Sequence, residues 1–182
     1  MACNFPGQIS NRNFLSPVGF QFSLGKYPTV SFFCNSARIP EISLSQMIQP
    51  NYLKSLDVPG GLIEYGDLSL RFLVDEDMVN YSTVHNWITG LGFPESTKDF
   101  KDFITNDDGI EDNKEQFSDG SLLILNSNYR AVSTVRFRDL FPVSLTSLDF
   151  EATDTDINYF TAQVSFKYTI YDILGPDGRT PL

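Results

Sequence analysis

The sequence has little of the chemistry that enzymes and metal sites use. Its 182 residues include one histidine, His85, and two cysteines, Cys3 and Cys34. A single histidine removes most routes to a histidine metal site or to a histidine-based catalytic triad within one chain. Two cysteines cannot build a disulfide framework, so we expect synthesis in a reducing intracellular compartment.

Several other signals are also missing. No apolar run approaches the roughly 18 residues of a membrane helix, and the opening MACNFPGQISNRNF has no basic start followed by an apolar core, as a signal peptide would. The chain has no GxxxxGK[ST], GxGxxG, GxSxG or CxxC motif. Lysine and arginine number 13 against 23 acids, and the net charge of −10 argues against strong binding to phosphate backbones. We expect no enzyme, no metal, no cofactor and no membrane contact.

Aromatic residues, in contrast, are abundant: 16 Phe and 8 Tyr, which favour strands. The hydrophobic share of 41% and the charged share of 20% fit one globular domain. Alternation of apolar and polar residues predicts strands over 18–24, 29–37, 68–74, 122–125, 132–137, 144–150 and 160–170. We expect the first two strands to pair as a hairpin. The predicted fold class is mainly β, an antiparallel β-sandwich or barrel with one flanking helix.

The helix is predicted over about 77–91. Its apolar residues recur at spacings of three and four and form one stripe for packing on the sheets: Tyr81, Val84, Trp87, Ile88 and Leu91. The acids of 75–77 precede it, where a helix N-terminus favours negative charge. Gly92 and Pro94 suit its end.

Two segments fit neither period. Residues 46–60, QMIQPNYLKSLDVPG, are interpreted as a long apolar loop, and their apolar residues are candidate inter-subunit contacts: Met47, Ile48, Tyr52, Leu53, Leu56 and Val58. The alternative is a loop that folds over its own core. Residues 95–119 hold nine acids and three bases, which predicts a surface insertion. Residues 1–16 are expected to be an extended arm, and 175–182 an exposed tail.

The remaining polar groups give weak site candidates. His85 has no carboxylate or thiol within one helical turn, which favours a surface histidine. The acidic groups at 75–77 and 154–156 are expected to be solvated turns. The stretch from Ile104 to Glu115 resembles a calcium loop, but its first position has no side-chain oxygen, so calcium binding is not expected there.

Several strings, in their order along the chain, resemble the tail tube protein superfamily of contractile-tailed bacteriophages. They cover most of residues 18–173, and the third and fourth are the most specific: GFQFSL, SFFCNSARIPEISL, LSLRFLVDEDMVNYSTVHNWITGL, VRFRDLFPVSLTSLDF and YFTAQVSFKYTIYDI. The overall pattern is similar to that of T-even-like phages and suggests a phage that infects cyanobacteria.

The resemblance implies a structural virion protein that forms hexameric rings. The rings would stack into a tube, with the sheets of six subunits joined into one inner barrel of about 24 strands, roughly 50 Å across. Residues 17–174 would be the tube domain, with 41–66 as an arm that reaches a neighbouring subunit. The implied partners are sheath, baseplate and terminator proteins, and double-stranded DNA that passes through without specific binding. The implied location is the virion tail, assembled in the host cytoplasm.

Three other functions remain open at this stage. A baseplate tube-initiator or hub-junction ring and a tail terminator ring share the same fold. A β-sandwich carbohydrate-binding module is a different class, and it would place aromatic residues on the polar faces of its strands. For a tube, we expect a bore with net negative charge, because a wall that conducts DNA must not hold phosphates.

Overall fold

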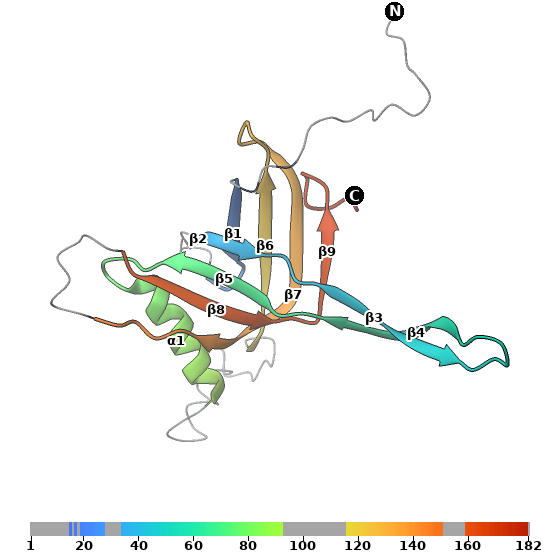
Figure 1. Ribbon diagram of the computed structural model, residues 1–182. Coiled ribbons are helices and arrows are strands. Elements are labelled where there is room, and N and C mark those ends of the chain that lie inside the picture. The colour runs from blue at the N-terminus through green and yellow to red at the C-terminus, as the bar shows by residue number, and fades with distance from the viewer. Residues whose placement is uncertain are drawn as a thin grey trace, which may run out of the picture.

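The computed structural model describes residues 15, 17, 19–27, 34–92, 116–150 and 159–181. The described part holds one helix and nine strands, and all of its strand pairings are antiparallel. The predicted mainly β fold class is therefore confirmed (Figure 1). The elements are β1 (Phe20–Leu24), β2 (Cys34–Arg38), β3 (Ile42–Gln49), β4 (Leu56–Tyr65), β5 (Leu68–Leu73), α1 (Val79–Gly92), β6 (Ser118–Leu125), β7 (Ala131–Leu145), β8 (Thr161–Lys167) and β9 (Ile170–Leu174).

Strand β7 joins two layers of the fold. The hydrogen-bonded order is β1-β6-β7-β8-β5-β2, and β9 also pairs with β7. The first part of β7 pairs with β6 and β9, and its last part, from Phe141 on, pairs with β8. A bulge lies between them, where Asp139 adopts a φ of 53°. In Figure 1 the strands β1, β6 and β9 stand upright, while β2, β5 and β8 run across the lower part of these strands.

The core lies between these two layers. Leu68, Leu70 and Phe72 of β5 alternate with polar neighbours and are at most 2% exposed. The same alternation buries Val164 and Phe166 of β8. The inner faces of the upright strands pack against the buried residues of β5 and β8. They contribute these buried residues to the core: Phe22, Leu24, Leu122, Val135 and Phe137. The two-residue period in the sequence therefore identifies the face of each strand that is buried in the core.

Helix α1 closes one side of this core. Val84 and Trp87 are fully buried, and Tyr81, Ile88 and Leu91 pack against the core as half-buried residues. The Trp87 indole N–H donates a hydrogen bond to the Gln116 carbonyl (3.3 Å). At the start of the helix, the buried Asn80 amide donates to the Leu73 carbonyl (2.8 Å), which ties α1 to the end of β5.

Three predictions about strands are wrong in their pairing or bounds. Strands β1 and β2 do not form a hairpin, because β1 pairs with β6 and β2 with β5, at opposite ends of the strand order. The alternation of apolar and polar residues identifies the buried face of a strand, but it does not identify the strand with which it pairs. No separate strand covers 144–150, since β7 continues to Leu145. The last predicted strand is split at Tyr168–Thr169, where the chain passes from one layer to the other.

Some predicted features lie outside the described residues. They are most of the N-terminal arm, residues 95–115 of the acidic insertion with the calcium-like stretch, and the acids at 154–156. The predicted end of the insertion at 119 is wrong, because Ser118 is already a buried residue of β6.

Candidate assembly interface

Strands β3 and β4 form a hairpin that projects from the body of the molecule (Figure 1). Among the described strands they pair only with each other, from Ile42 opposite Tyr65 at the root to Gln49 opposite Leu56 at the tip. The prediction of an irregular apolar loop over 46–60 is therefore wrong. Pro59 and the two glycines after it are typical of a loop, but in the structure they belong to β4.

A kink interrupts the hairpin between Leu44 and Gln46, where the register shifts. The Ser45 hydroxyl accepts a hydrogen bond from the Leu62 N–H (3.2 Å) at this point. A Cβ atom on Gly60 would lie 2.3 Å from the Ser45 hydroxyl oxygen, so only glycine allows the two strands to approach this closely. The shift also breaks the two-residue alternation, which is why sequence periodicity misses these strands.

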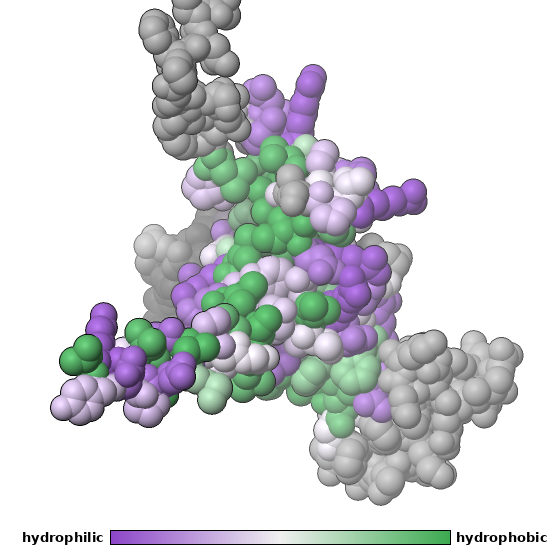
Figure 2. All heavy atoms as spheres, turned by 90° about the vertical axis from the view of Figure 1, so that its right-hand side faces the viewer, coloured by the Kyte–Doolittle hydropathy of each residue, from purple (hydrophilic) through white to green (hydrophobic). Residues whose placement is uncertain are grey.

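The hairpin exposes apolar side chains on both of its faces. Each of the six candidate contacts is exposed, from 38% for Val58 to 99% for Tyr52. Four further exposed residues were missed by the sequence analysis: Ile42, Leu44, Leu62 and Ile63. Figure 2, viewed from the side toward which the hairpin projects, shows hydrophobic surface on this side of the molecule. Exposed apolar groups on an arm of two strands, which has little stability alone, make this hairpin the candidate interaction surface of the described residues.

Two tyrosines fix the root of the hairpin to the body. The Tyr171 hydroxyl donates to the Pro40 carbonyl (3.2 Å), just before β3 begins. The Tyr168 hydroxyl donates to the Gly66 carbonyl (2.9 Å), just after β4 ends. The Gly66 N–H in turn donates to the Glu41 carbonyl (3.0 Å) and closes the root. Each of the two connections between the hairpin and the body therefore accepts a hydrogen bond from a tyrosine hydroxyl. A backbone hydrogen bond also joins the two connections to each other.

Aromatic packing supports these hydrogen bonds. The Tyr65 ring contacts Tyr171 and Tyr168 edge-on, at centroid distances of 5.7 and 6.1 Å. Phe137 of the core lies 5.1 Å from the Tyr168 ring. Partial burial, reinforced by neighbouring Tyr171, Tyr65 and Asp67, raises the pKa of Tyr168 to about 12, so its hydroxyl stays a donor at neutral pH. The cluster holds the arm at a set direction and leaves its far end exposed.

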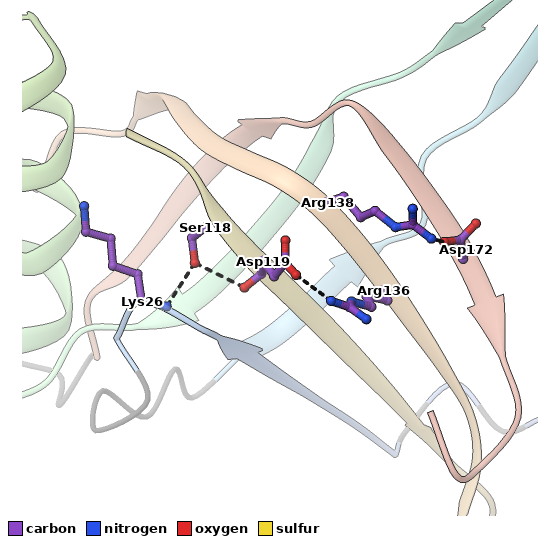
Figure 3. A network of polar contacts seen from close by, with 6 residues as sticks. All are labelled: Lys26, Ser118, Asp119, Arg136, Arg138 and Asp172. Atoms are coloured by element: carbon purple, nitrogen blue, oxygen red, sulfur yellow. Dashed lines mark hydrogen bonds and ion pairs between the residues drawn. The ribbon is translucent and has the colours of Figure 1, made fainter. Parts of the chain in front are cut away.

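The outer faces of the two layers are polar. On the upright layer, Arg136 pairs with Asp119 (2.7 Å) and Arg138 pairs with Asp172 (Figure 3). The hydrogen bond to Asp119 raises the pKa of the Arg136 guanidinium. Beside them, the Lys26 backbone N–H donates to the Ser118 hydroxyl (3.0 Å).

On the crossing layer, the outer face also carries paired polar groups. Lys167 pairs with Asp67 (2.8 Å), and the Gln163 amide donates to the Ser69 hydroxyl (3.0 Å). Polar rather than aromatic side chains therefore occupy the outward positions of β5 and β8, unlike the face expected of a carbohydrate-binding module.

The described residues offer no catalytic centre. They contain no group of three or more His, Cys, Asp or Glu residues placed to hold a metal ion. His85 is exposed on α1. Burial raises the pKa of the Cys34 thiol to about 12, which makes it a poor nucleophile. Among the described helices none is long and apolar enough to span a membrane.

Comparisons with known proteins agree with this structural character. No curated protein sequence matches the chain. The tube-terminating cap of the anti-feeding prophage is 18% identical, with a TM-score of 0.63 over 92% of this chain and 95% of that one. A chain of the sheath–tube complex of the PVC extracellular contractile injection system is 20% identical, with a TM-score of 0.57 over 90% and 93%.

The sheath/tube terminator of the PVC system is also 20% identical, with a TM-score of 0.54 over 96% of this chain and 100% of that one. At these identities the likeness shows a shared fold. The family model "Phage tail tube protein" matches residues 2–174, nearly the whole chain. The chain therefore belongs to the phage tail tube protein family and is a structural, tube-type subunit and not an enzyme.

Proposed function

We propose that this chain is the repeating subunit of the tail tube of a contractile-tailed phage. Six copies form a ring, and rings stack into a tube that conducts double-stranded DNA during ejection. The observation that carries the proposal is the β3–β4 hairpin, which projects from the body with apolar side chains on both faces. A soluble monomer gains nothing from such an arm, whereas a neighbouring subunit would cover it.

Open sheet edges give the lateral contact within a ring. Strand β1 pairs only with β6, and β2 only with β5, among the described residues. A neighbouring copy that adds a strand beyond β1 or β2 would join the sheets of six subunits into a closed barrel. Closure of this kind removes the exposed edges that otherwise promote irregular aggregation.

The polar outer face of β5 and β8 is the proposed wall of the bore. Without the hairpin connection 50–55, residues 34–73 and 161–167 carry three bases and four acids: Arg38, Arg71 and Lys167, and Glu41, Asp57, Glu64 and Asp67. In this proposal the wall is therefore close to neutral with a small negative excess, in the direction of the acidic bore expected from the sequence. A balanced wall meets the same requirement, because a base compensated by a neighbouring acid attracts phosphates weakly.

A tail terminator ring is the second candidate, since the structural neighbours include terminators as well as a sheath–tube complex. The two roles differ in copy number. A tube subunit fills the length of the tail and is present in many rings, with the sheath around it and the baseplate and terminator at its ends. A terminator or tube-initiator occurs once per tail, as a single ring.

Copy number per virion separates these roles. Quantitative mass spectrometry of purified particles, calibrated with labelled peptides of this chain and of the major capsid protein, should give many multiples of six copies per tail. A value near six would assign the chain to a terminal ring and contradict the tube role.

A further inference from the structure

A hollow of about 540 Å³ lies at the end of β5, beside the start of α1. Its apolar lining includes Phe150, Tyr159 and Phe160, with the Phe150 and Phe160 ring centroids 4.7 Å apart. Phe150 and Tyr159 are 72% and 79% exposed, although aromatic rings of this size are usually covered in a folded domain. The described residues leave this apolar hollow open.

Acidic residues border this hollow. Asp75 and Glu76 belong to its lining, and Asp77 and Asp149 adjoin it in the chain. No base of the described residues forms an ion pair with these four carboxylates. The hollow therefore suits a ligand that combines apolar groups with a positive charge.

The tip of the β3–β4 hairpin has this combination. Residues 50–55 connect the two strands, and they present Tyr52 and Leu53 at 99% and 91% exposure. Lys54 follows directly and is the only charged residue of this connection. No acid of the described residues pairs with it.

The tip and the hollow lie at opposite ends of the molecule. In the antiparallel pair of β5 and β8, Leu68 lies opposite Phe166 at the end next to the hairpin root, and Leu73 lies opposite Thr161 at the end next to the hollow. Figure 1 shows the hairpin leaving at one side and the β5–α1 connection at the other. A protrusion and its receptor at opposite ends are the requirement for a heterologous, head-to-tail contact between identical chains.

We propose that the hairpin tip of one copy docks in the β5–α1 hollow of a second copy. Tyr52 and Leu53 cover the exposed Phe150 and Tyr159 rings, and Lys54 lies against Asp75 and Glu76. This inference rests on the proposed tube function and adds the receptor site for the arm. One contact would then cover both the apolar side chains of the hairpin tip and the exposed rings of the hollow.

Charge exchange tests the ionic part of this contact. Lys54→Glu and Glu76→Lys should each raise the protein concentration at which assembly begins by about tenfold or more, because like charges then meet at the interface. The double variant should return to within about threefold of wild type. Arg130→Glu, in the exposed β6–β7 turn, makes the same charge change as Lys54→Glu and should have little effect. Lack of rescue in the double variant would overturn the ionic pairing.

A disulfide cross-link tests the contact directly. The parent carries Cys3→Ser, and Cys34 stays in place because its thiol is poorly reactive. Leu53→Cys combined with Tyr159→Cys should give ladders of covalent multimers on oxidation of assembled protein. Leu53→Cys combined with Tyr129→Cys, which is 75% exposed in the β6–β7 turn, should not.

The outcomes separate the two proposals. If the parent assembles into tubes but only the Tyr129 pair cross-links, or neither pair does, the docking site is wrong and the tube function stands. If the parent does not assemble in any condition, both are overturned. Ladders from the Tyr159 pair alone establish the contact.

Discussion

The Tyr168 hydroxyl donates a hydrogen bond to the carbonyl of Gly66, 102 residues earlier in the chain. This bond joins the short connection between β8 and β9 to the root of the projecting hairpin, directly after β4. The Tyr171 hydroxyl makes the equivalent bond to Pro40 on the other strand of the root. Two tyrosines that lie in the body of the molecule thus hold the root of the projecting hairpin.

Tyr168→Phe should loosen the arm without unfolding the body. The lost hydrogen bond is worth about 0.5–1.5 kcal/mol, and hydrogen–deuterium exchange should become faster in peptides that cover residues 41–66. Tyr81→Phe is a matched control, because it removes a tyrosine hydrogen bond to the Thr146 carbonyl (3.1 Å) far from the arm. Equal exchange in the hairpin for both variants would show that Tyr168 does not position it.

Stability should fall in alkaline solution partly through Tyr168. Its pKa is raised to about 12 in the folded protein, against about 10 for an unfolded tyrosine. Between these values the unfolded chain binds fewer protons, so the contribution of Tyr168 is complete below pH of about 10 and is lost as the pH rises through about 12. Thermal unfolding across this range should show a shallower loss of Tm for Tyr168→Phe than for wild type. Identical pH profiles would refute this assignment.

Asp67→Asn tests the proposed wall of the bore. The substitution removes the carboxylate that compensates Lys167, so assembled tubes should retain short duplex DNA at low ionic strength and release it as salt is added. Asp119→Asn removes the carboxylate that compensates Arg136 on the other layer, and it serves as the control. This control should not increase retention. More retention with Asp119→Asn than with Asp67→Asn would place the bore on the other face.

Trp87→Ala should destabilise the fold itself. Trp87 is fully buried against Phe166 and Tyr27, and its truncation should cost about 3–5 kcal/mol in the free energy of unfolding. His85→Ala, on the exposed side of the same helix, should change it by less than about 0.5 kcal/mol. Urea unfolding of the unassembled protein measures both. A small effect of Trp87→Ala would mean that α1 is dispensable for the core.

The sequence predicts those parts of the fold in which local pattern and burial agree. The stripe from Tyr81 to Leu91 lies in or against the core, because helical spacing alone decides which side chains share a face. The alternation at Leu68, Leu70 and Phe72 is equally direct. Strand partners are not encoded locally, which is why the predicted hairpin of β1 and β2 is wrong.

The candidate site illustrates a different limit. Its six predicted apolar residues are all exposed on the arm. The sequence nevertheless predicts a loop there, because Pro59, Gly60 and the register shift interrupt the alternation of its strands. The β5–α1 hollow could not be predicted at all, because Phe150 and Tyr159 come together with Met78 only through the packing of separate elements.

The central claim is that this chain forms closed six-subunit rings that stack through the hairpin. Electron cryo-microscopy of the purified protein at increasing concentration tests it most directly, with a variant that lacks residues 49–56 alongside. We predict six-fold rings of the 20.5 kDa chain that stack into tubes, and single rings or monomers for the shortened variant. Monomers alone at every concentration for the intact chain, or unchanged tubes without the tip, would contradict the account.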